Sequence, residues 1–330
     1  MTAYIGVDIA KKTYAVAVET SKGIQKREFP NQPQGHKQML RWVEKLIGES
    51  KPCFVMEATS TYHLQSALFL ISCSKEVAVV NSRSVHDFHK AMGYKNKTDL
   101  TDAEVLAHFG KVKQPRCWQP PSKKIVELRG LVKRREELMR MLTQEGNRIQ
   151  TPMLTEEQKK SLRKIISALR EERDRIERKI KEMINDDHQL RETVKLLTSI
   201  TGVGPIVATT LIAIVGDISL FKNKRSFCSY LGVNPRQFRS GSSVHWSRMS
   251  KEGLPIARKC LFIASLVGAQ HEPIFREYVS SLIKRGKSYK RAIAALMRKL
   301  AGIIYAIWSK GTPFSADTYR KIQAKFQLAP

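Results

Sequence analysis

The chain has 330 residues and a mass of 37.6 kDa, and its 58 Lys and Arg residues outnumber 30 Asp and Glu residues, giving a formal net charge of +28 at pH 7. Because 42% of the residues are hydrophobic, the chain can build real cores, which excludes disorder as its dominant state and predicts roughly two or three domains. The positive charge predicts an anionic partner, and nucleic acid fits best because basic surfaces release counterions when they neutralise phosphates. A basic surface without a partner is the alternative.

The charge is unevenly distributed. Residues 1–110 carry a net +3, residues 111–190 carry +8 and residues 191–330 carry +17. Five scattered cysteines without a CxxC pair argue against a disulfide framework and a zinc knuckle. Neither a signal sequence nor an uninterrupted apolar run of about 18 residues is present, so we expect a cytoplasmic protein that does not contact a membrane.

Residues 1–115 alternate strand-like and helix-like patterns. Residues 4–9 and 14–18 predict a β-hairpin, residues 53–56 and 77–80 predict buried strands, and the segments around 39–46 and 64–71 predict helices. Such alternation after a hairpin is typical of an α/β domain. Prolines at positions 115, 120 and 121 indicate its boundary.

Residues 116–190 are charged and helical in pattern. Apolar residues recur at heptad-like spacing, first at Ile125, Leu128, Val132, Met139 and Leu142, and then at Leu162, Leu169, Ile176 and Met183. The pattern predicts a helical hairpin or coiled coil that serves dimerisation or spacing. A long solvated helix is the alternative, because Glu172 and Lys179 interrupt the second seam.

Residues 191–330 predict a third, mostly helical domain that carries most of the charge. It opens with two hydrophobic helices joined by a turn at Gly202 and Gly204, a helix-hairpin-helix pattern whose exposed N–H groups suit a DNA phosphate. A dinucleotide-binding fingerprint is excluded, because the third glycine and a preceding strand are missing. A role in packing alone is the other alternative.

Four carboxylates in the first domain are candidates for metal chemistry. Asp8 lies inside an apolar strand, Glu57 closes another, and Asp99 and Asp102 stand three residues apart. A carboxylate in an apolar strand needs a cation or hydrogen bonds, and several together repel one another unless a divalent ion holds them. Oxygen-only ligands favour Mg²⁺ or Mn²⁺.

Asp99 and Asp102 share one face only if residues 99–102 are helical. A capping box at Thr101 and Glu104 is the alternative; it would start the helix later and make Asp102 partly a first-turn charge.

A second candidate site is the Ser- and Gly-rich segment around Ser240. The cations that flank it are Arg236, Arg239, Arg248 and Lys251. A serine hydroxyl facing a phosphate held by guanidinium groups is a possible nucleophile. A loop that only contacts phosphate is the more common role of such a segment.

Seven motifs carry a resemblance that runs in order over nearly the whole chain. They are Gly-Val-Asp-Ile-Ala at 6–10, Met-Glu-Ala-Thr-Ser-Thr-Tyr at 56–62, Asn-Lys-Thr-Asp-Leu-Thr-Asp-Ala at 96–103, Ile-Thr-Gly-Val-Gly-Pro at 200–205, Leu-Gly-Val-Asn-Pro at 231–235, Ser-Gly-Ser-Ser at 240–243 and Ser-Arg-Met-Ser-Lys at 247–251. Together they resemble the DEDD transposases of the insertion-sequence 110 family, which are bridge-RNA-guided recombinases.

The resemblance implies an α/β plus α protein. Residues 1–115 would form a RuvC-like domain of RNase H fold, residues 116–190 a coiled-coil assembly segment, and residues 191–330 a transposase domain with a helix-hairpin-helix. The four metal ligands would be Asp8, Glu57, Asp99 and Asp102, and Ser240 would be the nucleophile that forms a phosphoserine link to DNA.

The resemblance also implies the partners and the setting. These would be double-stranded donor and target DNA, a guide (bridge) RNA and further copies of the chain, as a homodimer that joins into a tetramer. The protein would act at the nucleoid of a bacterium or archaeon. From the residues alone, an Mg²⁺-dependent structure-specific nuclease resembling a junction resolvase, with water as nucleophile, and a non-catalytic nucleic-acid scaffold stay open.

Overall fold

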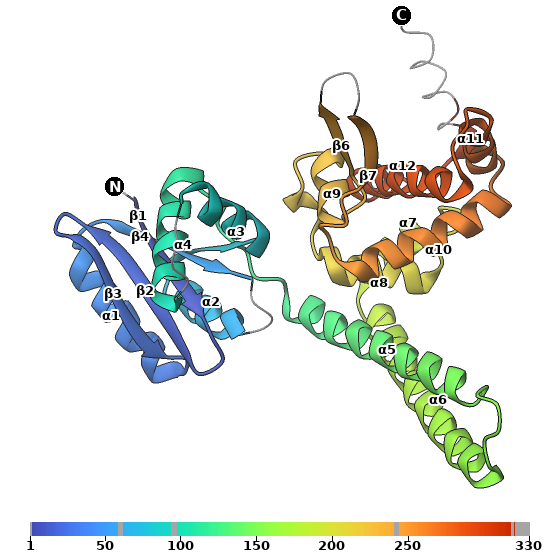
Figure 1. Ribbon diagram of the computed structural model, residues 1–330, viewed down its shortest axis with the longest axis horizontal. Coiled ribbons are helices and arrows are strands. Elements are labelled where there is room, and N and C mark those ends of the chain that lie inside the picture. Colours follow the sequence, from blue (N-terminus) through green and yellow to red (C-terminus); the bar gives the residue numbers. More distant parts are fainter. Residues whose placement is uncertain (1, 59–61, 94–97, 241–243, 318–319, 321–330) are drawn as a thin grey trace, which may run out of the picture. The chain divides into compact units, whose positions relative to one another are not determined.

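A computed structural model describes the backbone of residues 2–58, 62–93, 98–240, 244–317 and 320, with their side chains except those of residues 237–240 and 244–248. The chain forms two compact units, unit 1 at Met1–Pro120 and unit 2 at Pro121–Pro330 (Figure 1). The α/β plus α class is confirmed, because a mixed sheet with helices builds unit 1 and helices dominate unit 2.

Unit 1 is built on a five-stranded sheet in the order β3-β2-β1-β4-β5. Its strands are β1 (Thr2–Ile9), β2 (Thr13–Thr20), β3 (Gly23–Pro30), β4 (Lys51–Glu57) and β5 (Glu76–Val80). Strands β1, β2 and β3 are antiparallel neighbours, whereas β4 lies parallel to β1 and β5 parallel to β4. The carboxyl ends of β1, β4 and β5 therefore meet at one end of the sheet.

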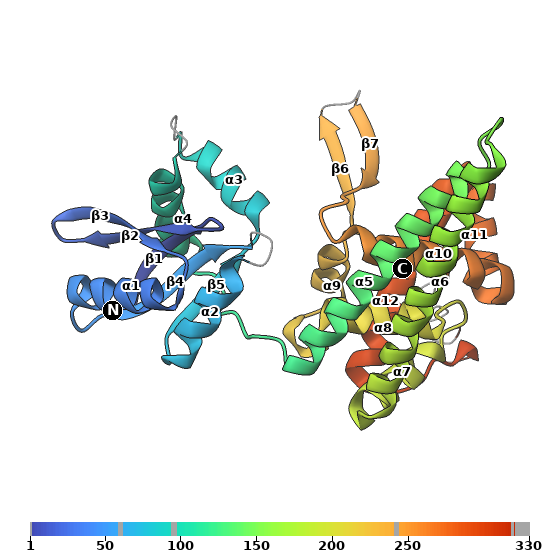
Figure 2. The same cartoon turned by 90° about the horizontal axis from the view of Figure 1, so that it is seen from below.

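Helices cover both faces of this sheet, as Figure 2 shows. They are α1 (Pro33–Ile47), α2 (Tyr62–Ser72), α3 (Ser82–Ala91) and α4 (Asp99–Lys113). One core joins α1 and α2 to the face that bears Val7, Val16 and Met56. Smaller clusters join α3 and α4 to the opposite face, which bears Val55 and Ala78. Because helices cover both faces, consecutive residues in the middle of β1 and β4 are buried.

Unit 2 has one hydrophobic core that extends from Ile125 to Ile307. Its helices are α5 (Lys123–Arg148), α6 (Glu156–Asn185), α7 (His188–Thr198), α8 (Pro205–Val215), η1 (Ile218–Leu220), α9 (Lys224–Tyr230), α10 (Pro255–His271), α11 (Pro273–Lys284) and α12 (Tyr289–Lys310). The predicted segment 116–190 thus shares its core with the predicted domain 191–330. The division into three domains stays a prediction.

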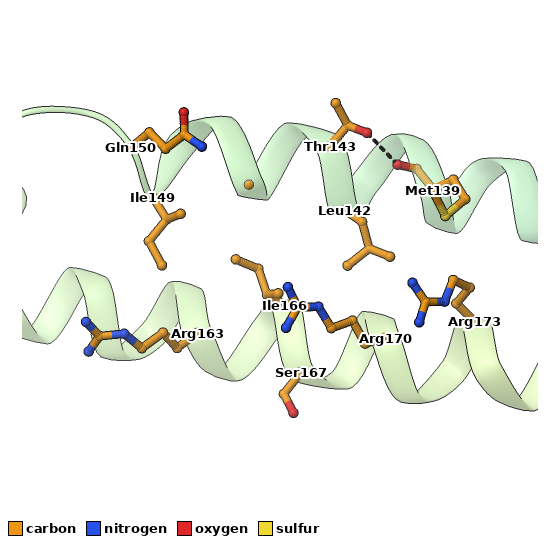
Figure 3. A pocket seen from close by; sticks show the side chains of 11 residues that line it. Met139, Leu142, Thr143, Ile149, Gln150, Arg163, Ile166, Ser167, Arg170 and Arg173 are labelled. Atoms are coloured by element: carbon orange, nitrogen blue, oxygen red, sulfur yellow. Dashed lines mark hydrogen bonds between the residues drawn. The ribbon is translucent and has the colours of Figure 1, made fainter. Parts of the chain in front are cut away.

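Helices α5 and α6 form a long hairpin. Thr155 and Gln158 start α6 with a capping box, in which each side chain bonds the other's backbone. Near the unit core the apolar seam is buried, at Leu128 and Ile176. Toward the hairpin tip a cavity of about 550 Å³ opens between the helices, and Leu142 of α5 and Ile166 of α6 both point into it (Figure 3). The coiled-coil character predicted for this segment stays a prediction.

Two further elements complete unit 2. Strands β6 (Pro235–Ser240) and β7 (Val244–Met249) form an antiparallel hairpin that extends from the helices (Figure 1). Within the described residues, α12 is the one helix long and apolar enough by composition to span a membrane. Residues such as Leu296, Leu300 and Ile304 of α12 are fully buried, which is typical of a core helix.

Candidate active site

Asp8 and Glu57 lie side by side at the carboxyl end of the sheet. Val7 of β1 pairs with Met56 of β4 in parallel register, so the next residues along the two strands, Asp8 and Glu57, are neighbours on the same face. Both are partly accessible, unlike Val7 and Met56, which are fully buried on the other face. The period of two in a strand places these carboxylates on the face covered by α4.

Gly6 allows α4 to lie directly on β1. A Cβ at Gly6 would fall 1.8 Å from the Ala103 carbonyl oxygen and 2.5 Å from the Ala107 nitrogen. The C-terminal part of α4 lies near the start of β1, because a Cβ at Gly110 would lie 2.9 Å from Cδ1 of Tyr4. Helix α4 therefore runs antiparallel to β1, and its first turn lies over Asp8.

The first turn of α4 contains Asp99 and Asp102. Thr98 caps the helix, since its Oγ1 accepts a hydrogen bond from the Thr101 N–H at 3.2 Å. The alternative capping box at Thr101 and Glu104 is wrong, because the helix already begins at Asp99 and Glu104 instead pairs with Lys26 of β3. Both aspartates are thus helical, and the positive end of the helix dipole favours their charge.

The four carboxylates act on one another electrostatically. Burial raises the pKa of Asp8 to about 6, and the negative charges of Asp102, Asp99 and Glu57 contribute to the rise in that order, while a hydrogen bond from the Ile9 backbone opposes the shift. The sequence motifs were far apart, at positions 8, 57, 99 and 102. The fold brings them together at one end of one sheet.

The donor set fits a hard divalent cation by its chemistry. All four side chains offer oxygen. Burial, and after it the three neighbouring carboxylates, raises the pKa of Asp8, and a bound cation would offset both effects. As they stand, no three His, Cys, Asp or Glu side chains within the described ranges are close enough to hold one ion. Their role as metal ligands therefore stays a prediction.

The turn after Asp8 is fastened by Asn31. The Asn31 side-chain amide donates to the Ala10 carbonyl at 3.0 Å, and its backbone N–H donates to the Lys12 carbonyl at 2.8 Å. The side-chain oxygen Oδ1 of Asn31 is 3.1 Å from Nε2 of buried His36. The loop that follows Asp8 is thus held in place by Asn31, which follows β3, and Asn31 in turn contacts His36 of α1.

Ser240 is the last residue of β6, opposite Val244 of β7. Its side chain and those of Arg239 and Arg248 lie outside the described residues, as do Gly241, Ser242 and Ser243 as a whole. The rest of the predicted site is described: Arg236 pairs with Glu252 at 3.0 Å, and Lys251 is exposed with a φ of 57°.

The turn that contains Gly202 joins α7 to α8, and the helix-hairpin-helix character expected for it stays a prediction. Gly202 adopts a φ of +96°, and a Cβ there would lie 2.3 Å from the Ala264 carbonyl of α10, so packing alone requires glycine. Gly204 is exposed and caps α8, and a Cβ added there would meet no atom within 4 Å. DNA binding by this turn stays a prediction, and the packing alternative accounts for Gly202.

Sequence reasoning missed two features of the site. Gly6 was quoted only as part of a motif, although a glycine within an apolar strand signals a close backbone approach. Asn31 follows a proline and lies in an unassigned segment, so no local pattern linked it to the turn after Asp8.

Comparison with known proteins identifies the family. A pilin gene-inverting protein of Moraxella lacunata is 32% identical over 319 residues, which cover 94% of this chain and 97% of that protein. A transposase family model matches residues 5–157, and the model of the IS116/IS110/IS902 transposase family matches residues 194–280. The chain belongs to this transposase family. Transposases cut and rejoin DNA, so this is the class of its activity.

Two further proteins show similarity to this transposase, one over nearly the whole chain and one over about a third of it. The transposase for insertion sequence element IS1328 of Yersinia enterocolitica is 24% identical, and the match covers 94% of this chain and 98% of that protein. A structure described as T. thermophilus RuvC in complex with a Holliday junction substrate aligns with 36% of this chain and 100% of its own, at 11% identity and a TM-score of 0.27.

Proposed function

We propose that this transposase cuts and rejoins donor and target double-stranded DNA under the guidance of an RNA, through a covalent link between DNA and Ser240. The observation that carries the proposal is the convergence of Asp8, Glu57, Asp99 and Asp102 at one end of the unit 1 sheet. In this proposal unit 1 is a RuvC-like domain of RNase H fold, which the mixed sheet covered by helices on both faces supports.

The four carboxylates would hold Mg²⁺ or Mn²⁺. When bound, the ion would supply Lewis-acid polarisation of a phosphoryl oxygen and neutralise charge at the scissile phosphate. The chain's own contribution is positioning: β1 and β4 present Asp8 and Glu57, while α4 carries the two aspartates toward them. The close contact at Gly6 fixes the distance between these two parts.

Ser240 would be the nucleophile. Its oxygen attacks phosphorus, a new phosphoserine bond forms, and the strand breaks with release of a deoxyribose hydroxyl that takes up a proton. A deoxyribose hydroxyl of the partner strand then attacks the phosphoserine, and the serine is released with its proton restored. Since one phosphoester replaces another, the bond energy is kept and rejoining needs no ATP.

Supporting observations for the serine step are in the sequence. Residues 194–280, which include the Ser-Gly-Ser-Ser motif, match the transposase family. The flanking Arg236, Arg239, Arg248 and Lys251 would stabilise charge on the phosphate, and Gly202 and Gly204 would contact a neighbouring phosphate.

The partners follow from charge and family. A net charge of +28 supports binding of both DNA and a guide RNA. The relative named as a pilin gene-inverting protein supports rejoining as well as cutting, because inversion of a segment requires both. We further propose that the chain works as a homodimer that joins into a tetramer, with the α5–α6 hairpin in assembly.

A metal-dependent nuclease with water as nucleophile is the second candidate. The observation that favours it is that all four carboxylates come from unit 1, so a hydrolytic site could be complete without Ser240. The two candidates differ in one product, since only the recombinase forms a protein–DNA bond.

The proposal can be tested in cells with the gene and its flanking DNA on one plasmid and target DNA on another. We expect Asp8→Asn and Ser240→Ala each to abolish rejoined donor–target junctions, measured by quantitative PCR. Asp87→Asn removes the same charge from an exposed position of unit 1 and should leave junctions at wild-type level. Junctions formed by Asp8→Asn at that level would contradict the carboxylate site.

A further inference from the structure

A turn of unit 2 far along the chain from the serine segment carries a dense positive charge. Residues 284–291, which we call the basic turn, read Lys-Arg-Gly-Lys-Ser-Tyr-Lys-Arg and link α11 to α12. Five of the eight residues are basic and all eight are exposed. The cations are Lys284, Arg285, Lys287, Lys290 and Arg291.

These charges have no acidic neighbours in the sequence to neutralise them. The segment from 278 to 316 contains no Asp or Glu. None of the five cations forms an ion pair with a residue that the structure describes. The α5–α6 hairpin differs, since many of its charges pair with one another, as in Arg175 with Glu172. The basic turn is therefore an exposed cluster of cations that is suited to an anion from outside the chain.

The backbone of the turn is well defined. Lys287 N–H donates to the Leu282 carbonyl at 3.0 Å, and Gly286 N–H donates to the Ile283 carbonyl at 2.9 Å. This pair of bonds, with Gly286 at a φ of 79°, is a Schellman ending of α11. Because α12 begins directly afterwards, the cations are held on a short, hydrogen-bonded turn, which reduces the entropy lost when a ligand binds.

An exposed aromatic ring stands among the cations. Tyr289 is the first residue of α12, and 54% of its surface is accessible. A tyrosine at a helix start with so much exposed surface contributes little to the core. A ring beside phosphate-binding cations is the arrangement on which an unpaired base can stack while its backbone is neutralised.

We propose that the basic turn binds a single-stranded nucleic-acid segment, with its phosphates on the five cations and one base on Tyr289. The choice of nucleic acid as partner class rests on the proposed function. A single strand is favoured over a duplex because the bases of a duplex are already stacked, so Tyr289 would have no partner there. The shared ligand is a phosphodiester backbone with an unpaired base, in RNA or in DNA.

The charge arm of the test uses fluorescence anisotropy with the full chain and labelled single strands of about 20 nucleotides, long enough to cover one such site. The variant Lys284→Gln/Lys287→Gln/Lys290→Gln should bind about tenfold or more weakly, and the slope of log affinity against log salt should flatten by about 2, at roughly 0.7 per phosphate on a single strand. The matched control changes three exposed lysines of unit 1, Lys22→Gln/Lys37→Gln/Lys45→Gln, and should lose clearly less affinity. Equal loss in both variants would show an effect of net charge and overturn the proposal.

The stacking arm uses Tyr289. Tyr289→Ala should weaken single-strand binding by about 5-fold to 100-fold, Tyr289→Phe should restore it, and binding of a duplex of the same length should not change. Wild-type affinity of Tyr289→Ala, or an equal loss on duplex, would overturn the proposal. RNA and DNA single strands are run in parallel, and the tighter one identifies the natural ligand.

These outcomes are independent of catalysis. All binding measurements are repeated with Asp8→Asn in the background, which removes the proposed cleavage. Failure of the binding arms with intact donor–target junction formation would overturn the assignment of the turn alone. Thermal unfolding of each variant at the wild-type temperature shows that lost binding does not come from lost folding.

Discussion

Gly6 and Asp8 are two residues apart on β1, and together they set the geometry and charge of the carboxylate cluster. Gly6 lets α4 pack closely against β1, and the negative charges of Asp99 and Asp102 on α4 then act on Asp8. The sequence predicted Asp8 because a carboxylate within an apolar strand needs an explanation. It could not predict that Asp8 lies beside Glu57, because this depends on the parallel register of β1 and β4. These two strands are separated by 41 residues, between Ile9 and Lys51.

Replacement of Gly6 by alanine should damage both the fold and the site. A Cβ 1.8 Å from a backbone oxygen forces α4 away from β1, so we expect a loss of about 1–3 kcal/mol in the free energy of unfolding, measured by urea denaturation. Gly130→Ala is the control: no atom lies near its Cβ position in α5, and it should be neutral or stabilising. Equal stability of both variants would contradict the close contact.

Asp8→Asn should stabilise the protein at alkaline pH. Since the folded pKa of Asp8 is raised to about 6 from its ordinary value of 3.8, the neutral form contributes stability that is full below about pH 4 and is lost as pH rises through about 6. The variant cannot ionise at position 8. Without divalent metal, its free energy of unfolding at about pH 8 should therefore exceed the wild-type value by up to about 2 kcal/mol, a figure that allows for solvent screening. At about pH 5 the difference between the two proteins should be smaller. Thermal unfolding at both pH values checks this.

The same thermal unfolding measurement can be repeated with added divalent metal. Added Mg²⁺ or Mn²⁺ should raise the melting temperature of the wild-type protein at about pH 8, because an ion offsets the crowded charges, but not that of Asp8→Asn. A variant less stable than wild type at that pH without metal would show that Asp8 has a structural role instead.

At the scale of elements, the α5–α6 hairpin is well packed at one end and open at the other. Leu128 is fully buried, whereas Leu142 lines the cavity of about 550 Å³. We expect Leu128→Ala to cost about 2–5 kcal/mol in the free energy of unfolding, and Leu142→Ala only about 1 kcal/mol, since its surroundings already include a void. Equal costs in denaturant unfolding would contradict this difference in packing.

The elements that sequence reasoning found are those with strong apolar periodicity. The hairpin of β1 and β2, the buried β4 and β5 and helix α2 were predicted near their observed bounds, whereas α1 begins at Pro33, well before the predicted segment 39–46. Strand β3 was missed because seven of its eight residues are exposed, so it lacks the apolar alternation of a half-buried strand. Strands β6 and β7 were assigned to a loop, since glycine, serine and arginine dominate that segment.

At the scale of the whole molecule, charge decides the partner class. The net charge of residues 191–330, +17 over 140 residues, was visible in the sequence, and the fold adds that eight exposed residues gather five of these cations in one turn. The sequence could not show that residues 121–190 share a core with the rest of unit 2, because that core depends on contacts such as those of α5 with α8 that join distant segments.

The affinity of the full chain for duplex DNA should fall steeply with salt. With many cations neutralising phosphates, the slope of log affinity against log salt should be several units negative, at roughly 0.9 per phosphate. Fluorescence anisotropy from about 50 to 200 mM salt measures the slope. A slope near zero would remove the charge-based argument for a nucleic-acid partner.

The covalent intermediate tests the central claim most directly. End-labelled DNA is incubated with the protein, the RNA transcribed from the DNA that flanks its gene and Mg²⁺, and then run on a denaturing gel. The account predicts a denaturant-resistant protein–DNA adduct with the wild-type chain that disappears in Ser240→Ala and in EDTA, while Ser242→Ala and Ser243→Ala keep most of it. Cleavage by Ser240→Ala at the wild-type rate without an adduct would contradict the account and favour the nuclease that uses water.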